Sequence, residues 1–151
     1  MTAKARVLVV ANRTAQSDEL FETLRARSAR GPVSFMLLVP ATWEVSDPHG
    51  GRETARRRLN GALARLHSVG LEVEGVLGDS DPMLAVKEIW DPPRFDEIIV
   101  STLPARISNW LKRDLPCRVE RHTGKTVTHV IASEAVESSP RDGGPVSAVS
   151  N

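Results

Sequence analysis

The sequence predicts an α/β protein with a single doubly wound, five-stranded parallel sheet in the order 3-2-1-4-5 and helices on both faces. Strand-like and helix-like patterns alternate along the chain, which indicates strands joined by right-handed helical crossovers. The strand-like runs are short and largely apolar, as expected for strands that are covered on both faces. With 151 residues, of which 40% are hydrophobic, the chain is long enough for one domain with a core and too short for two.

The first strand and the first helix are marked by an apolar run and a capping serine. The run from Val7 to Ala11 predicts a central strand. Ser17 can accept a hydrogen bond from the first turn of a helix, and Asp18 and Glu19 then lie near the positive end of the helix dipole. The pair Gly31-Pro32 predicts the end of this helix.

A second strand, Val33 to Val39, is followed by a long polar connection that begins at Pro40 and reaches Gly51. The next helix is expected from Glu53 onward, because apolar residues then recur at helical spacing. This apolar stripe consists of Ala55, Leu59, Leu63 and Leu66. The arginines expected to lie off the stripe are Arg56, Arg57, Arg58 and Arg65.

The third strand, Leu71 to Leu77, leads into a turn that favours the start of a helix. Gly78 permits a tight turn, Asp79 and Asp81 supply capping side chains, and Pro82 suits the first helical position. The helix is expected to end before the prolines at positions 92 and 93, because a residue that precedes proline avoids the helical region.

Two further strands flank an unusually basic segment. Glu97 to Val100 predicts the fourth strand, and a loop is expected to open at Ser101. The helical segment that follows is expected to be bent or divided at Pro116. Thr126 to Ala132 predicts the fifth strand.

The strand order predicts where a ligand would bind. In such a sheet the strand order reverses between the first and fourth strands, and ligands collect where the carboxyl ends of these strands diverge. Ala11-Asn12 and Ser101-Thr102 are therefore expected to face each other across one crevice, where helix N-termini also present free N–H groups. The candidate ligand-binding residues are Ala11, Asn12, Val39, Gly78, Asp79, Ser101, Thr102, Arg106 and Ser108.

Four segments carry a family resemblance through their order and spacing. They are RVLVVAN as the opening strand, EVEGVLGDSDPMLAV as strand, turn and helix, FDEIIVST as the fourth strand, and RHTGKTVTHVI as the closing strand. Across residues 6–132 the chain resembles the universal stress protein family, small members of the adenine nucleotide alpha hydrolase-like α/β superfamily. The resemblance implies a small cytoplasmic regulatory or stress-response protein, commonly a homodimer, which binds ATP in one branch of the family and not in another.

The chain departs from this family at its phosphate-binding signature. The nucleotide-binding branch has Gly-x2-Gly-x9-Gly followed by Ser or Thr after the fourth strand, and backbone N–H groups there cradle phosphates. These glycine positions fall on Ser101, on Pro104, and on Arg113 or Asp114. Proline has no N–H group, and a residue with a Cβ cannot let the chain approach a phosphate as glycine does. Asn12 stands where the family often has an acidic residue, so we expect no ATP binding of the usual kind.

Basic side chains are an alternative means of holding phosphate. Between Ser101 and Lys125 there are six basic and two acidic residues, a local excess of four positive charges. Guanidinium groups could replace backbone amides as donors, and Ser101, Thr102 and Ser108 could add hydroxyl contacts. We favour the simpler interpretation of a solvated helix face, because helical periodicity sends many of these residues in different directions. Arg106 and Ser108 lie nearest the loop and are the best candidates for a ligand contact.

Other patterns give little support to catalysis, metal binding or base stacking. The four histidines show no pair at metal-ligand spacing, and one cysteine cannot complete a zinc site with them. The chain lacks the G-x-S-x-G elbow of a serine nucleophile, and Asp79 and Asp81 are explained by helix capping. The run Arg56 to Arg58 has no aromatic neighbour on which a base could stack. No catalytic residue and no metal ligand are therefore assigned.

Composition limits the partners and the compartment. Lys plus Arg is 20 and Asp plus Glu is 19, so the formal charge of +1 gives no field that would attract nucleic acid or an anionic membrane. No apolar run approaches the length of a membrane span, the N-terminus lacks the features of a signal peptide, and the single Cys117 fits a reducing compartment. We expect a cytoplasmic protein with a domain at residues 1–132 and a flexible C-terminal tail at residues 133–151, where large apolar side chains are scarce.

Three functions fit these observations. The leading hypothesis is a nonenzymatic universal-stress-type regulatory module that forms a homodimer through the strand Thr126 to Ala132, because an exposed strand edge is readily paired by a second copy. The alternative is a nucleotide-binding switch or slow ATP hydrolase, with ATP or another adenine nucleotide as its ligand. The third is an adaptor whose own side chains fill the crevice and whose arginine-rich helix binds a protein partner.

Overall fold

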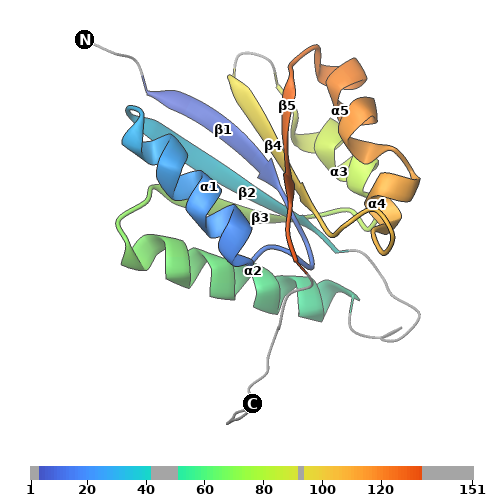
Figure 1. The fold of residues 1–151 in the computed structure, drawn as a ribbon, viewed down its shortest axis with the longest axis horizontal. Helices are drawn as coiled ribbons and strands as arrows, with labels where there is room; N and C mark the ends of the chain where they lie inside the picture. Colours follow the sequence, from blue (N-terminus) through green and yellow to red (C-terminus); the bar gives the residue numbers. More distant parts are fainter. Residues whose placement is uncertain (1–3, 42–50, 92–93, 134–151) are drawn as a thin grey trace, which may run out of the picture.

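Five parallel strands form one sheet in the order β3-β2-β1-β4-β5 in the computed structural model, which describes residues 4–41, 51–91 and 94–133 (Figure 1). The fold class and the strand order predicted from the sequence are confirmed. The strands are β1 (Ala5–Val10), β2 (Val33–Pro40), β3 (Val73–Gly78), β4 (Glu97–Thr102) and β5 (Val127–Ile131). The helices are α1 (Asp18–Ala29), α2 (Gly51–Ser68), α3 (Pro82–Ile89), α4 (Asn109–Lys112) and α5 (Leu115–Thr123).

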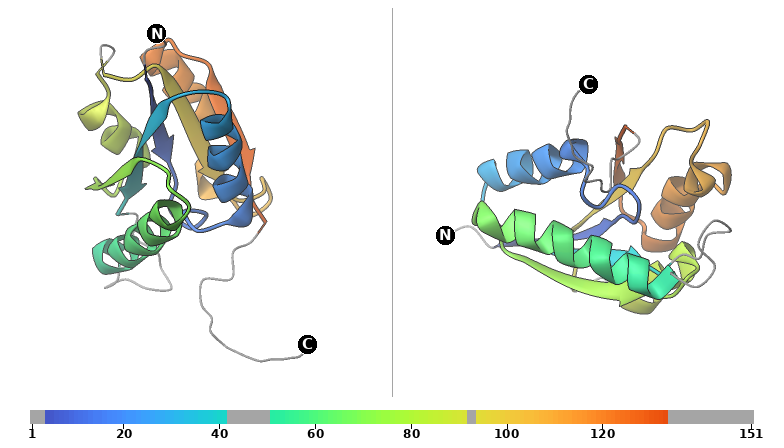
Figure 2. Two further views of the ribbon diagram at one scale, coloured as in Figure 1. Left: turned by 90° about the vertical axis from the view of Figure 1, so that its left-hand side faces the viewer. Right: turned by 90° about the horizontal axis from the view of Figure 1, so that it is seen from below.

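Two apolar clusters lie on opposite faces of the sheet. Successive side chains of a strand point to opposite faces, so β1 contributes Val7 and Val9 to one cluster and Leu8 and Val10 to the other. The first cluster includes residues of α1 and α2, which lie side by side (Figure 2), and the second includes residues of α3 and α5. This two-sided burial explains why β1 is apolar at every position from Val7 onward.

The predicted caps fix the starts of α1 and α3. The Ser17 hydroxyl accepts a hydrogen bond from the Leu20 amide at 3.1 Å. Asp81 accepts one from the Met83 amide at 2.9 Å, and Pro82 occupies the first turn of α3. Both helix starts thus lie where the capping residues predicted them.

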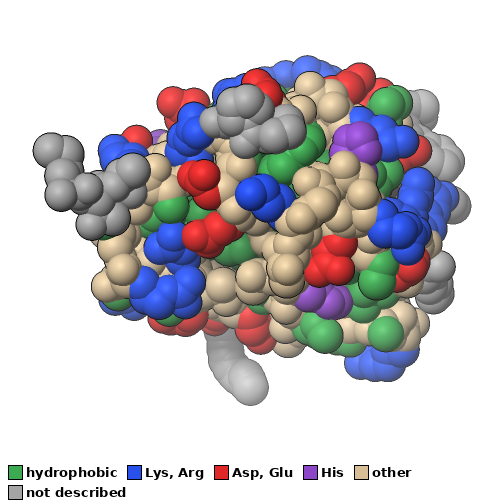
Figure 3. Space-filling model, turned by 90° about the horizontal axis from the view of Figure 1, so that it is seen from above, with side chains coloured by type: hydrophobic (Ala, Val, Ile, Leu, Met, Phe, Trp, Pro, Cys, Tyr) green, Lys and Arg blue, Asp and Glu red, His purple; other side chains and the backbone are tan. Residues whose placement is uncertain are grey.

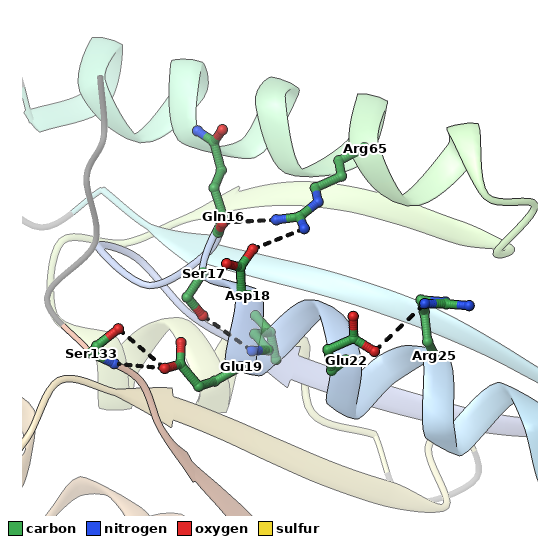
Figure 4. Close-up of polar contacts among 9 residues, drawn as sticks. Gln16, Ser17, Asp18, Glu19, Glu22, Arg25, Arg65 and Ser133 are labelled. Carbon is green, nitrogen blue, oxygen red and sulfur yellow. Dashed lines mark hydrogen bonds and ion pairs between the residues drawn. The ribbon is translucent and has the colours of Figure 1, made fainter. Parts of the chain in front are cut away.

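Arg65 of α2 ties this helix to the start of α1 (Figure 4). Its guanidinium donates hydrogen bonds to the Asp18 carboxylate at 2.9 Å and to the Gln16 carbonyl at 3.3 Å. The same group lies 3.9 Å from the centroid of the Phe21 ring, a cation–π distance. The contacts hold the end of the β1–α1 loop in place, and that loop forms one side of the candidate site.

β4 is longer than the sequence predicted. The loop expected to open at Ser101 begins after Thr102, because Ser101 and Thr102 pair with Val130 and Ile131 of β5. Strand pairing uses main-chain groups and needs no apolar side chain, so the end of the apolar run was a poor marker of the strand end. The other predicted strand ends differ from the observed ones by at most two residues.

The basic segment is divided as predicted, just before its proline. α4 ends at Lys112 and α5 begins at Leu115, which places Pro116 in the first turn of α5. Proline is tolerated there because the amide it lacks has no partner within the helix. Between the two helices Asp114 has φ 59°, a left-handed conformation that favours glycine.

Two predicted regions fall outside the described residues. Pro40 itself belongs to β2, where it pairs with Gly78, and residues 42–50 of the predicted polar connection are not described. The same holds for residues 134–151 of the predicted tail. Within the described ranges, no helix has the length and apolar character needed to cross a membrane. Acidic and basic side chains are interspersed on the face shown in Figure 3, in keeping with a net charge of +1.

Candidate ligand site at the carboxyl ends of the strands

The structure brings the ends of β1 and β4 together at the predicted switch point. Val10 pairs with Val100, so the residues that follow each of them emerge at the same edge of the sheet. Ala11 is fully buried, and its amide continues the strand pattern by donating to the Leu38 carbonyl at 3.2 Å. The β1–α1 loop reaches β4 directly, since the hydroxyl oxygens of Thr14 and Ser101 lie 2.6 Å apart.

Both polar groups of the Asn12 side chain are engaged within the protein. Its amide nitrogen donates to the Pro40 carbonyl at 2.8 Å, and its carbonyl oxygen accepts from Arg58 of α2 at 2.5 Å. Asn12 is only 5% exposed and Arg58 only 9%. The side chain that stands in the position of the family's acidic residue therefore connects β1 to β2 and α2.

Arg58 is a site residue whose burial was not predicted from the sequence. It was expected to lie off the apolar stripe of α2, yet it is buried beside that stripe. Helical spacing could have found it, because Arg58 lies three residues after Ala55 and four before Ala62, and both alanines are buried. The expectation of a solvated arginine holds for its neighbours Arg56 and Arg57, which are exposed.

The hydroxyl of Thr102 joins β4 to the edge strand. Its oxygen donates to the Leu103 carbonyl at 2.9 Å and lies 2.8 Å from Nε2 of His129 in β5. The hydrogen bond between Thr102 and His129 joins β4 to β5, and the tautomer of His129 decides which of the two atoms donates.

Partial burial lowers the pKa of His129 below its ordinary value. An unfolded histidine takes up a proton near its ordinary pKa, whereas folded His129 does so at lower pH. Between these two values the unfolded chain binds more protons, so the free energy of unfolding should decrease as the pH falls through this window. Urea unfolding from neutral pH to about pH 5 should show this slope, and His129→Gln should reduce it while the remaining histidines stay unchanged. An equal slope in both proteins would contradict the assignment.

Two predicted site residues serve the packing of the fold. Val39 is fully buried in β2 within the first apolar cluster. Gly78 ends β3 where α3 approaches closely, and a Cβ built on it would lie 2.7 Å from the Cβ of Ala85 and 2.8 Å from Cδ1 of Leu38. Gly78 thus allows the helix to pack against the sheet, which is sufficient to explain a glycine there.

Three further candidates occupy turns or helix starts. Asp79 accepts a hydrogen bond from the Asp81 amide at 2.9 Å, a local turn contact. Ser108 is buried, and its hydroxyl accepts from the Leu111 amide at 3.1 Å in the manner of a helix cap. Arg106 is exposed in the turn before α4. Of these three, Arg106 is exposed, Asp79 is half-buried and Ser108 is buried.

The polar side chains at this edge of the sheet are buried, and this burial limits the ligand contacts that they can make. Asn12, Thr14, Ser101 and Thr102 are each at most 5% exposed, and each has a hydrogen-bond partner inside the protein. A ligand that used these side chains would first have to displace the internal partners, at a cost in buried hydrogen bonds. Among the described residues no group of three or more histidine, cysteine or acidic side chains could hold a metal ion.

A shallow hollow of about 190 Å³ lies at the opposite, amino end of the sheet. Its lining mixes basic and acidic side chains with apolar ones. The lining residues are Arg6, Val7, Ser34, Phe35, Met36, Glu72, Glu74, Arg94 and Phe95. In open α/β sheets ligands bind at the carboxyl ends of the strands, so this location does not match the usual site.

Several solved structures with the same architecture are universal stress proteins. One from Archaeoglobus fulgidus has a TM-score of 0.60 and 18% identity, covering 83% of this chain and 93% of that one. A second, from the same organism in complex with dAMP, has a TM-score of 0.57 and 18% identity over 86% of this chain and 99% of that one. A third, from Arabidopsis thaliana with AMP bound, has a TM-score of 0.55 and 16% identity over 91% and 97%.

The chain has the universal stress protein fold. A further universal stress protein, in complex with cAMP, matches with a TM-score of 0.54 and 19% identity over 87% of this chain and the whole of that one. At these sequence identities the structural similarity establishes the fold only. Which ligand this chain binds must be inferred from its own residues. No protein-family model matches the sequence, and none of the curated proteins compared with it matches either.

Proposed function

We propose that this chain is a nonenzymatic regulatory or stress-response module of the universal stress type that does not hold ATP in the family's usual way. The main support for the proposal is that buried side chains close the space at the carboxyl ends of β1 and β4. The polar side chains after β1 and at the end of β4 are buried and bonded to one another, as in the pair Thr14–Ser101 and the pair Asn12–Arg58. A phosphate cradle would instead need exposed main-chain amides at these strand ends.

The three positions of the missing glycine signature support this proposal. Ser101 lies within β4 and is 1% exposed, so its amide belongs to the sheet. Pro104 follows the strand and offers no amide at all. Asp114, one of the two residues aligned with the third glycine, keeps a left-handed backbone but adds a carboxylate, which repels phosphate.

Calorimetric titration of the protein with ATP, ADP and AMP tests this proposal. We expect no heat of binding for any of them at concentrations up to about 1 mM. Substituting Arg106 with alanine should leave the titrations unchanged. Saturable binding of ATP in the micromolar range would contradict the proposal.

A second candidate function is binding of an adenine nucleotide through basic side chains. It is favoured by the solved structures of the same fold that contain dAMP, AMP and cAMP. Arg106 is an exposed basic residue in the turn that follows β4, and it is the candidate that we assign to a phosphate contact. If AMP binds and Arg106→Ala abolishes the binding, this second function replaces the first.

We further propose that the module acts in the cytoplasm as a homodimer that pairs through β5. β5 is an edge strand of the sheet, and its last residue, Ile131, is 54% exposed, which is unusual for a large apolar side chain. A symmetric dimer would pair this edge and cover that side chain. Light scattering at micromolar concentration should give twice the mass of the chain, and a strictly monomeric species would overturn this part of the proposal.

A further inference from the structure

α3 covers only part of the sheet face on which it packs, opposite α1 (Figure 2). Its eight residues give it a length of about 12 Å, whereas the eight residues of β2 span about 26 Å. α3 lies over the carboxyl half of β2 and β3, where Gly78 admits Ala85. The hollow of about 190 Å³ lies at the amino half of these strands, which this short helix leaves uncovered.

The alternation of side chains places charged lining residues of the hollow on the α3 face of the sheet. Leu8 of β1 and Val76 of β3 belong to the second apolar cluster, on that face. Arg6 and Glu74 each lie two residues before one of these positions, so their side chains point to the same face. Met36 of β2 pairs with Glu74, is half-buried and packs against the same cluster. Met36 therefore supplies an apolar floor between the two charged strands.

The charges that line the hollow are separated by sign. The acidic residues, Glu72 and Glu74, belong to β3 and to the position just before it. The basic residues, Arg6 and Arg94, belong to β1 and to the segment before β4, on the other side of β2. Two strand spacings, about 10 Å, separate the main chains of β3 and β1. A small ligand between these strands would have an acidic side chain on one side and basic ones on the other.

Glu74 and Arg94 are the lining charges most open to a ligand. Glu72 is engaged by Lys4, since the ammonium nitrogen and a carboxylate oxygen lie 2.6 Å apart. The Arg94 guanidinium lies 5.3 Å from the centroid of the Phe95 ring, a cation–π contact with a buried residue. Within the described part of the chain, neither the Glu74 carboxylate nor the Arg94 guanidinium forms an ion pair.

The position and size of the hollow limit the class of ligand. α3 ends at Ile89, so the partly negative end of its dipole lies at this end of the sheet and disfavours phosphate. A volume of about 190 Å³ is below the range of pockets for drug-sized ligands, about 300–1,000 Å³. The fitting ligand is therefore small and carries one cationic and one anionic group beside an apolar part.

We propose that this hollow is a binding site for a free α-amino acid with an apolar side chain. The ammonium group of the ligand faces Glu74, its carboxylate faces Arg6 and Arg94, and its side chain packs on Met36. Charge-assisted hydrogen bonds to both ends supply the recognition. The site is separate from the carboxyl ends of the strands, so it does not depend on whether a nucleotide binds there.

NMR titration of the isotope-labelled protein with L-leucine tests this proposal. The backbone amide signals of residues 34–36 and 72–74 should shift and saturate with a Kd of about 0.1–1 mM. The amides of Asn12 and Ser101, at the other end of the strands, should not shift. Isocaproate lacks the ammonium group of leucine and isoamylamine lacks its carboxylate, so each should bind at least about fivefold more weakly.

Two substitutions assign the two charged contacts. Glu74→Gln and Arg94→Gln should each weaken leucine binding about fivefold. Glu74→Gln should not weaken the binding of isocaproate, and Arg94→Gln should not weaken that of isoamylamine. Both side chains are exposed, so these variants should fold as the original protein does. The matched controls Glu88→Gln and Arg30→Gln change exposed residues outside the hollow and should leave the affinity for leucine unchanged.

Four results would overturn the proposal. The first is the lack of a saturable shift up to about 10 mM leucine. The second is equal affinity for leucine and its two analogues, and the third is a set of shifts confined to the carboxyl ends of the strands. The fourth is tighter binding of the dipeptide Gly-Leu than of leucine, which would assign the hollow to peptides. Binding of ATP at the carboxyl ends would refute the proposed function and leave all four criteria unaffected.

Discussion

Replacing Arg58 with methionine is expected to lower the free energy of unfolding by about 2 kcal/mol. Methionine keeps much of the apolar stem but removes the guanidinium that donates to the Asn12 carbonyl at 2.5 Å. Asn12 is 5% exposed, so the loss leaves a buried acceptor without a partner, which costs more than the hydrogen bond itself contributes. Urea unfolding at neutral pH measures the change.

Arg56→Met is the matched control, since Arg56 lies on the same helix and is exposed. It should change stability by no more than about 0.5 kcal/mol. A double-mutant cycle with Asn12→Ala should give a coupling of about 1 kcal/mol between positions 12 and 58. Equal losses for Arg56→Met and Arg58→Met, or additive effects in the cycle, would show that the Asn12–Arg58 contact does not hold the crevice closed.

Adding a single methyl group should have opposite effects at Gly78 and Gly61. Gly78→Ala places a Cβ 2.7 Å from the Cβ of Ala85, which has no rotamer to move, and should cost about 1–3 kcal/mol. At Gly61 the nearest atom, at 2.7 Å, is the side-chain oxygen of Gln16, an exposed and flexible residue. Gly61→Ala within α2 should therefore stabilise the protein by about 0.5–1 kcal/mol through helix propensity.

Thermal and urea unfolding of the two variants give the comparison directly. If Gly78→Ala were as stable as the original protein and instead changed ligand binding, Gly78 would belong to a ligand site rather than to the contact between β3 and α3. If Gly61→Ala destabilised the protein, the Gln16 side chain would be fixed more firmly than its exposure indicates.

The sequence predicts most of this fold because its signals are local. Apolar runs such as Val7 to Ala11 mark buried strands, and Ser17 and Asp81 mark helix starts through contacts within one turn. The extension of β4 through Ser101 and Thr102 could not be seen in this way, because it depends on pairing with β5 residues that lie 29 positions further along the chain. The pairing register of two strands that lie far apart in the sequence cannot be read from either strand alone.

The location of the candidate site follows from strand order, whereas its closure does not. The juxtaposition of Asn12 and Ser101 follows from the topology, but their partners Arg58 and Thr14 come from a helix face and a loop conformation. Helical spacing was sufficient to place Arg58 beside the buried stripe. Its burial was missed because an arginine side chain was assumed to be exposed to solvent. The hydroxyl pair of Thr14 and Ser101 depends on how the β1–α1 loop folds, for which the sequence gives no specific signal.

A crystal structure of the protein soaked in about 10 mM ATP would test the central claim most directly, because this concentration would reveal even weak binding. We expect no nucleotide between the ends of β1 and β4, with the contacts Thr14–Ser101 and Asn12–Arg58 unchanged. ATP bound in that crevice, with its phosphates held by main-chain amides after Thr102 and those side-chain contacts broken, would contradict it.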